Sequence, residues 1–279
     1  MKLRMLGVAV LGAVGLSALP ACDDEAAPTR QGTARPAPAP AASKGAPKSE
    51  PTAAAEPAPQ PLTGGGTVRG TISFKGVPPT PAAVAPSDDP ACDGMASSEQ
   101  SVRVKDGKLE NVLVRVRGLV PGPRPTQPVV IDQHQCTYLP RVQGATIGQP
   151  LLVKNSDGTL HNARALAGTK SLFNVAQPPH GKAVQRNLPA DVELVRLKCD
   201  IHPWMAAWVV VNPNRFFATS GADGSFSIEH LPAGTYTLEA WHETLGIRTA
   251  EITLKEGESV SASFEFSAQA PASASGGVK

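Results

Sequence analysis

Short segments with alternating polar and apolar residues recur along this chain, and turns rich in Gly, Pro or Asp close them. The segment 68–74 is one example: it reads Val-Arg-Gly-Thr-Ile-Ser-Phe and is followed by Lys-Gly-Val-Pro-Pro. A period of two is typical of β-strands, because successive side chains point to opposite faces of a sheet. No window carries an amphipathic helix of three turns. We therefore predict an all-β sandwich or barrel, with strands at 68–74, 112–116, 129–132, 150–155, 192–199, 207–211, 225–228, 235–241, 247–254 and 260–266.

The N-terminus has the pattern of an export signal. Lys2 and Arg4 precede an apolar run over residues 5–16, which is too short to span a bilayer comfortably. Cys22 follows Leu-Pro-Ala, which resembles the bacterial lipobox. We expect residues 1–21 to be a lipoprotein signal peptide and Cys22 to carry the lipid. The protein would then lie in the cell envelope, anchored in a membrane and facing the periplasm or the outer surface. The alternative is an ordinary signal peptide with an incidental Cys.

Composition separates a folded head from its flanking segments. Residues 22–65 are dominated by Ala and Pro and contain no aromatic residue, so they cannot bury enough apolar surface to offset the entropy of ordering. We expect a disordered tether there and a disordered tail over residues 268–279. Lys2 and Arg4 are two of the 26 basic residues, so a processed chain would carry 24 basic residues against 24 acidic ones. This near-neutral charge argues against a nucleic-acid partner.

Three further cysteines remain in the head. In an oxidising compartment two of the three should pair, and the odd thiol needs a reason. A disulfide between Cys92 and Cys136 would leave Cys199 free. A disulfide between Cys136 and Cys199 is the competing assignment, and it would remove the thiol from any metal site.

The residues from Cys199 to Met205 read Cys-Asp-Ile-His-Pro-Trp-Met, which places Cys199, His202 and Met205 at spacings of three. His161 lies upstream in Asn-Ser-Asp-Gly-Thr-Leu-His-Asn. Two His, one Cys and a weak Met are the ligands of a trigonal copper centre with a long axial bond. We therefore predict one mononuclear copper site formed by these four side chains.

Residues 128–212 resemble the cupredoxin family, of which plastocyanin and amicyanin are members. The resemblance rests on Gly-Gln-Pro-Leu-Leu-Val-Lys-Asn at 148–155, on Asp157, on the His161-Asn162 pair and on the Cys-x-x-His-x-x-Met loop. It implies a Greek-key β-sandwich in which Asn155 and Asn162 tie the two ligand loops together by hydrogen bonds. It also implies that Pro203 stiffens the ligand loop and that Trp204 shields the metal.

In that family the imidazole edge of the second His is the usual electron exit, and an apolar patch surrounds it. The resemblance implies that His202 has this role here. Pro203, Trp204, Ala206 and Ala207 would contribute to the patch.

The last stretch resembles a second family, the carboxypeptidase regulatory-like or transthyretin-like β-sandwich. The matching residues are Ala-Thr-Ser-Gly-Ala-Asp-Gly-Ser-Phe-Ser-Ile at 218–228 and Leu-Pro-Ala-Gly-Thr-Tyr-Thr-Leu at 231–238. The opening strands of such a module occur at 70–79 and 111–116, before the copper motif. We expect a discontinuous sandwich over 66–127 and 213–267, with the 128–212 module inserted into one of its loops. A cupredoxin with extra strands and a separate C-terminal domain is the equal alternative.

The predicted function is the transfer of single electrons to or from a redox protein partner. No Ser/His/Asp order, phosphate-binding loop or His-Glu-x-x-His motif is present, so we expect no enzymatic activity. A metal-independent binding module for protein or glycan, and copper storage or delivery, are the other hypotheses. We expect a structural role for His242, which is followed by Glu243.

Overall fold

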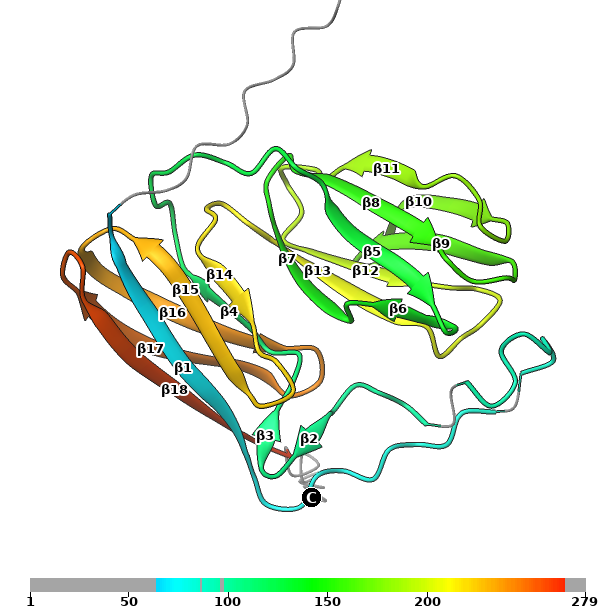
Figure 1. Cartoon of the computed structure of the whole chain (residues 1–279), viewed down its shortest axis with the longest axis horizontal. Helices are drawn as coiled ribbons and strands as arrows, with labels where there is room; N and C mark the ends of the chain where they lie inside the picture. The colour runs from blue at the N-terminus through cyan, green and yellow to red at the C-terminus, as the bar shows by residue number, and fades with distance from the viewer. Residues whose placement is uncertain (1–63, 86, 96–97, 269–279) are drawn as a thin grey trace, which may run out of the picture. The chain divides into compact units, whose positions relative to one another are not determined.

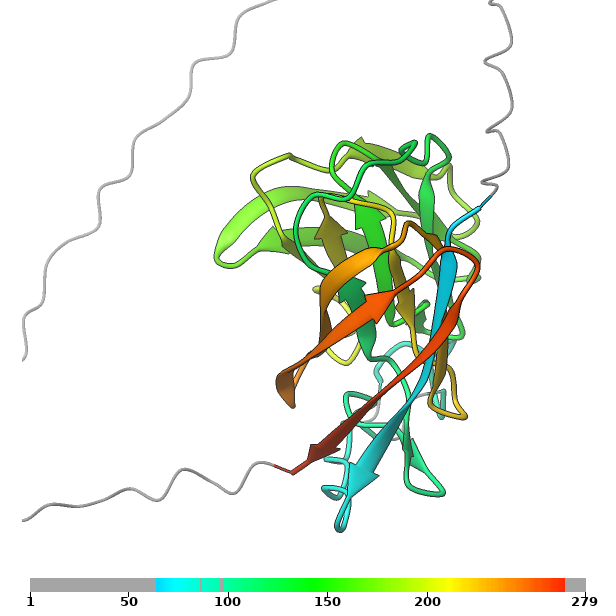
Figure 2. The ribbon, with the colours of Figure 1, turned by 90° about the vertical axis from the view of Figure 1, so that its left-hand side faces the viewer.

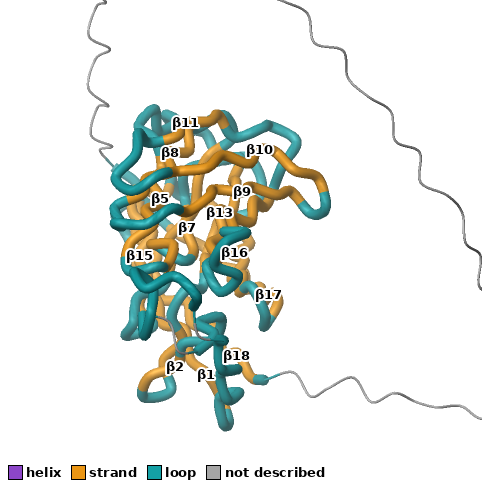
Figure 3. The backbone as a smooth tube through the Cα atoms, turned by 90° about the vertical axis from the view of Figure 1, so that its right-hand side faces the viewer, coloured by secondary structure: helices purple, strands orange, loops and turns teal. Residues whose placement is uncertain are grey.

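The computed structural model describes residues 64–85, 87–95 and 98–268, and it confirms the all-β prediction. In these ranges the chain forms strands, loops and turns, without an α-helix (Figure 3). It follows that none of them supplies a helix long and apolar enough to cross a membrane. The predicted signal peptide, Cys22, nearly all of the predicted tether and nearly all of the predicted tail lie outside the described residues.

Strands from both ends of the described chain build a first β-sandwich (Figure 1). One sheet has β1 (Gly66–Lys75) between β15 (Ser225–Leu231) and β3 (Lys108–Leu109), with β2 (Val104–Lys105) beyond β3 and β18 (Ser259–Ser267) also paired to β1. The other sheet has the order β14 (Phe217–Thr219), β4 (Leu113–Val116), β16 (Gly234–His242) and β17 (Gly246–Leu254). The strands before and after residues 117–216 therefore share both sheets.

Alternation of side chains gives this sandwich its core. In β1 the side chains of Val68, Ile72 and Phe74 are buried, while Arg69 and Lys75 between and beyond them are exposed. Gly70 permits a close approach of two backbones, because a Cβ atom there would lie 1.7 Å from the carbonyl oxygen of Ala262 on β18. The parallel pairing of β1 with β18, visible in Figure 2, depends on this glycine.

The middle of the chain forms a second sandwich with its own core. One sheet has the order β10 (Lys170–Gln177), β9 (His161–Ala167), β12 (Leu194–Lys198), β13 (Ala206–Asn212) and β7 (Val142–Thr146). The other has the order β11 (Val184–Asn187), β8 (Pro150–Asn155), β5 (Val129–His134) and β6 (Thr137–Leu139). Branched apolar side chains such as Ile131, Val153 and Leu197 fill the space between the sheets.

A smaller apolar cluster joins the two sandwiches. Leu113 of β4 packs with Val142 and Val210 of the middle module, and the ring of Trp208 meets that of Trp241 edge to face, 5.7 Å apart. Beside this cluster Arg141 binds the Glu243 carboxylate through two nitrogens. The Glu243 side chain is only 6% exposed, and the ion pair with Arg141 offsets the cost of burying a carboxylate.

Candidate metal centre

The sheet of β9, β12 and β13 brings the predicted ligands to one end of the middle sandwich. His161 is the first residue of β9, and Cys199 directly follows the last residue of the neighbouring strand β12. A tight loop then returns to β13, closed by hydrogen bonds from the Met205 N–H to the His202 carbonyl and from the Cys199 N–H to the Met205 carbonyl. Ligands far apart in sequence are thus held by antiparallel strand pairing.

Three potential ligand atoms converge in the interior. His161 Nδ1 lies 2.8 Å from His202 Nδ1, and Cys199 Sγ lies 3.8 Å from His202 Nδ1. Ligand atoms of all three residues are within 4.8 Å of one another. Each side chain is almost completely shielded from solvent, with at most 1% exposed surface. The geometry is that of a buried three-ligand cluster.

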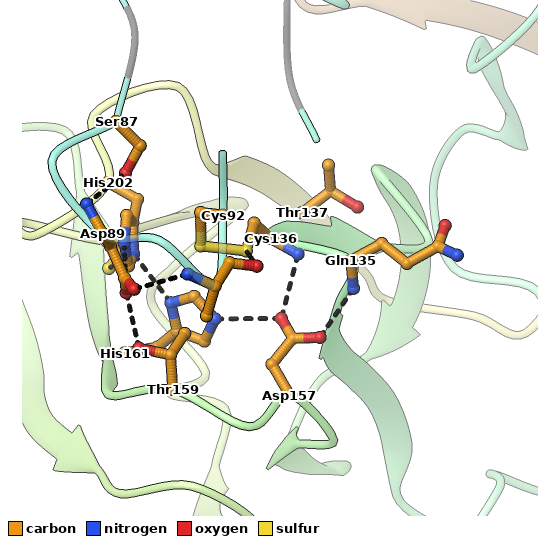
Figure 4. The surroundings of a disulfide bond; sticks show 12 residues. Ser87, Asp89, Cys92, Gln135, Cys136, Thr137, Asp157, Thr159, His161 and His202 are labelled. Carbon is orange, nitrogen blue, oxygen red and sulfur yellow. Dashed lines mark hydrogen bonds and ion pairs between the residues drawn. A yellow bond between two sulfur atoms is a disulfide. The ribbon is translucent and has the colours of Figure 1, made fainter. Parts of the chain in front are cut away.

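The outer nitrogen of each imidazole faces a carboxylate (Figure 4). His161 Nε2 lies 2.9 Å from Asp157 Oδ2, and His202 Nε2 lies 3.3 Å from Asp89 Oδ2. Asp157 also accepts hydrogen bonds from the backbone N–H groups of Gln135 and Cys136. An imidazole protonated at Nε2 presents the lone pair of Nδ1 to the centre, and the hydrogen bond between His161 and Asp157 favours that tautomer for His161.

The charges of the cluster suit a bound cation. Burial alone would raise the pKa of the Cys199 thiol, but hydrogen bonds from His161 and the Asn162 N–H lower it overall. Burial alone would lower the pKa of His161, whereas Cys199 and Asp157 raise it overall. Burial and the neighbouring His161 lower the pKa of His202. Two imidazole nitrogens and a sulfur converge at one buried point, and a metal ion could take the place of the protons that these atoms otherwise share, so the donor set fits a metal ion.

Met205 is the fourth predicted ligand. Its side chain is 1% exposed and packs in the same core cluster as Cys199. Its backbone closes the ligand loop at both hydrogen bonds described above. The structure thus buries the Met205 side chain in the core of the middle sandwich and holds its backbone in the ligand loop.

Asn162 links the two ligand segments. Its backbone N–H points to Cys199 Sγ at 3.5 Å, and its side-chain oxygen accepts a hydrogen bond from the Asp200 N–H at 2.6 Å.

Asn155 was also expected to tie the two ligand loops together, but its hydrogen bonds go elsewhere. Its amide nitrogen donates to the carbonyls of Thr159, Gln177 and Pro178, and its oxygen accepts from the Asp157 N–H. Asn155 therefore shapes the turn that carries Asp157 and does not reach the 199–205 loop.

The surroundings of His202 correct one expectation. Trp204 does lie beside it, with ring centroids 5.2 Å apart, and the indole N–H donates to the Cys136 carbonyl. Pro203 is exposed, but Ala206 and Ala207 are buried in β13 and form no surface patch. The imidazole edge of His202 is buried as well, because Asp89 lies over it.

Cys92 and Cys136 form a disulfide, and Cys199 is a free, buried thiol. The competing Cys136–Cys199 pairing is absent from the structure. The bond joins the turn around Cys92 to the β5–β6 turn, next to both imidazoles (Figure 4). It therefore lies beside the cluster of His161, Cys199 and His202 and leaves the Cys199 thiol free.

Sequence reasoning assigned no role to Asp89 or Asp157. A role for Asp157 could have been predicted, because it lies four residues before His161 in the same turn. A role for Asp89 could not have been predicted, because only the fold and the disulfide bring it close to His202. His242 lies in the first sandwich, where its Nδ1 accepts hydrogen bonds from the N–H groups of Thr244 and Leu245. It takes no part in the centre.

No family model matches this chain. No curated protein matches it either. Among solved structures, part of the chain is similar to a purple cupredoxin from Nitrosopumilus maritimus, with 20% identity, a TM-score of 0.27, and coverage of 30% of this chain and 98% of that one. An amicyanin mutant in its oxidised state is similar at 18% identity and a TM-score of 0.28, over 36% of this chain and 98% of the other.

A copper-containing nitrite reductase from Thermus scotoductus is similar at 18% identity and a TM-score of 0.28. The overlap covers 36% of this chain and spans 26% of the reductase. These partial similarities carry no argument about function. The functional argument uses only the side chains of the site.

Proposed function

We propose that this chain is a mononuclear copper protein that carries single electrons and catalyses no reaction of its own. The observation that supports this most is the convergence of Cys199, His161 and His202 in a buried cluster. Two imidazoles and one thiolate, with a thioether nearby, are the donor set of blue-copper electron-transfer sites. Copper bound there would supply a one-electron couple between Cu(I) and Cu(II).

The residues of the chain would keep the site rigid during electron transfer. His161 begins β9 and Cys199 follows β12, and these strands pair directly with each other. The Asn162 side chain fixes the start of the ligand loop at Asp200, and its backbone N–H points to the sulfur. A frame of this kind resists the change in ligand geometry that a change of oxidation state would otherwise cause.

We further propose that a lipid on Cys22 holds the protein in the cell envelope, where a redox protein exchanges electrons with it. The export pattern of residues 1–21 and the Ala/Pro-rich segment after it support this placement. A Cys22→Ser variant should move the protein from the membrane fraction to the soluble fraction. Equal membrane retention would contradict the anchor.

The copper proposal is tested by adding Cu(II) to the purified chain. We expect an intense visible charge-transfer band and a narrow copper hyperfine splitting, both from the bond to the Cys199 sulfur. Cys199→Ser should lose both signals with an unchanged circular dichroism spectrum, whereas Met205→Leu should keep the band. Absence of the band in the wild type, with the Cys199 thiol shown to be free, contradicts the proposal. Rapid loss of the metal to a chelator would favour storage or delivery over electron transfer.

A further inference from the structure

Residues 87–95 lie against the metal centre although they precede the middle module in the chain. A β-bridge between Ala83 and Ser98 closes the base of this segment. The disulfide of Cys92 with Cys136 joins it to the β5–β6 turn, whose N–H groups bind Asp157. Figure 4 shows the result: Asp89 beside His202, and the two sulfur atoms close to both imidazoles.

Both oxygens of the Asp89 carboxylate are held in place. Oδ1 accepts a hydrogen bond from the Ala91 N–H at 2.9 Å, and Oδ2 accepts one from the Thr159 hydroxyl. Thr159 belongs to the turn between Asp157 and His161, so Asp89 is fixed to the middle module as well as to its own segment. Oδ2 then lies 3.3 Å from His202 Nε2.

His202 Nε2 depends on this carboxylate. The atom is buried, and no residue in the described ranges gives it a hydrogen bond of ordinary geometry. A buried N–H without an acceptor costs on the order of 1–3 kcal/mol. Asp89 Oδ2 lies 3.3 Å from this atom and is the carboxylate oxygen that could accept its proton, although the contact lacks the hydrogen-bond geometry that Asp157 has with His161.

Metal-binding imidazoles generally donate their second N–H to a carboxylate or carbonyl, which fixes the tautomer and the ring orientation. His161 receives its carboxylate from its own turn, four residues away. The corresponding group for His202 comes from a distant segment that a disulfide holds.

We propose that Asp89 is a positioning residue of the metal centre, which holds His202 with Nδ1 toward the metal, and that the Cys92–Cys136 disulfide keeps Asp89 there. This inference rests on the proposed copper site. It gives the disulfide a role in metal binding in addition to any role in stability. It also explains why the imidazole edge of His202 is covered rather than exposed.

The first experiment compares Asp89→Ala with Asp88→Ala in the full chain. The two variants remove the same charge from adjacent residues, but Asp88 is exposed and makes none of the contacts of Asp89. We expect Asp89→Ala to raise the Cu(II) dissociation constant about 10–100-fold and to change the position of the charge-transfer band. Asp88→Ala should stay within about twofold of the wild type. Imidazole nitrogen NMR of the metal-free protein should show a loss of the Nε2–H tautomer of His202 only in Asp89→Ala.

Thr159→Val provides an independent route if Asp89→Ala does not fold. It removes the hydroxyl that holds Asp89 Oδ2 and leaves the Thr159 carbonyl, which binds Asn155, unchanged. We expect a smaller rise in the dissociation constant, in the same direction. If Asp89→Ala does not fold, a wild-type value for a folded Thr159→Val protein overturns the proposal; if Asp89→Ala folds, a wild-type value for that variant overturns it.

The role of the disulfide is tested by a cycle with the Cys92→Ser/Cys136→Ser double variant. If the disulfide acts by placing Asp89, the double variant should bind Cu(II) as weakly as Asp89→Ala, and adding Asp89→Ala to it should change the affinity less than twofold. If the effects of the double variant and of Asp89→Ala on the Cu(II) affinity are fully additive, the disulfide does not act by placing Asp89. If wild-type protein shows no charge-transfer band, the proposed function fails. If it shows the band but Asp89→Ala and Asp88→Ala behave alike, only the positioning role fails.

Discussion

Asn162 joins the start of β9 to the 199–205 loop by hydrogen bonds. Its substitution should therefore destabilise the protein. Asn162→Ala removes the acceptor for the Asp200 N–H and the donor to Asn174. Because the side chain is buried, we expect the free energy of unfolding to fall by about 1–3 kcal/mol. Denaturant unfolding measures the change. Asn187→Ala, at an exposed position, is the control, and equal stability of the two variants would contradict the prediction.

His242 should make the protein sensitive to acid independently of the metal centre. Burial lowers its pKa to about 4, and the charge of Arg141 contributes in the same direction. The unfolded chain takes up the proton near pH 6.5, whereas the folded protein resists it until about pH 4. The free energy of unfolding therefore falls as the pH drops through this window, by about 3 kcal/mol at most.

This prediction is checked by urea unfolding at a series of pH values. His242→Gln should lose the part of the pH dependence between pH 6.5 and 4 that this group causes. His230→Gln alters an exposed His and should keep the wild-type slope. Identical slopes for the wild type and His242→Gln would rule out the assignment.

The convergence of Cys199 and His202 with His161 could be predicted from the sequence, because two of the three residues share one short loop. Cys199, His202 and Met205 need only a tight turn, and His161 follows a recognisable strand. Asp89 could not be predicted, because its role requires a disulfide and a hydrogen bond to Thr159. The expectation that the imidazole edge of His202 lies in an apolar surface patch was wrong for the same reason. The segment with Asp89, which covers this edge, is remote from His202 in sequence.

At the scale of the strands, β1 gives the sharpest prediction. Gly70→Ala would place a methyl group 1.7 Å from the carbonyl oxygen of Ala262, a backbone atom of β18 that cannot move alone. We expect a loss of about 3 kcal/mol or more in unfolding free energy. Gly158→Ala, where an added Cβ meets nothing within 4 Å, should change stability by less than about 0.5 kcal/mol. Similar values for the two variants would show that β1 and β18 can separate without cost.

Ten strands could be predicted, among them β4 and β13, whose residues are nearly all buried and show no alternation. Each predicted range overlaps a strand of the structure, including β17, whose exposed and half-buried residues alternate almost to its end. The other eight strands of the described residues were not predicted, and β9 and β10 are the longest of them. β9 reads His-Asn-Ala-Arg-Ala-Leu-Ala, which has low strand propensity, and its first three residues are all buried. Its position between β10 and β12 makes it a strand, so sheet pairing overrides local preference there.

At the scale of the whole molecule, the contact between the sandwiches depends on Arg141. Arg141→Ala would leave the buried Glu243 carboxylate without its cation, and the Trp208 indole N–H that also binds Glu243 does not neutralise its charge. We expect a loss of about 3–5 kcal/mol. Denaturant unfolding followed by tryptophan fluorescence measures this loss of unfolding free energy, because Trp208 and Trp241 lie at the contact between the sandwiches. Arg124→Ala, at an exposed site, should be neutral, and an equally small effect of Arg141→Ala would contradict the prediction.

The parallel pairing of β1 with β18 also determines how the molecule would respond to force. β1 begins beside the start of β18, and their register continues from Thr67 and Ser259 to Lys75 and Ser267. A pull between the N-terminal side of β1 and the C-terminal side of β18 would therefore draw the two strands past each other along their length. All the hydrogen bonds between them would bear this load together, and the rate of forced unfolding reflects the barrier to breaking them. We therefore expect the pairing of β1 with β18 to resist tension applied between these two strand ends.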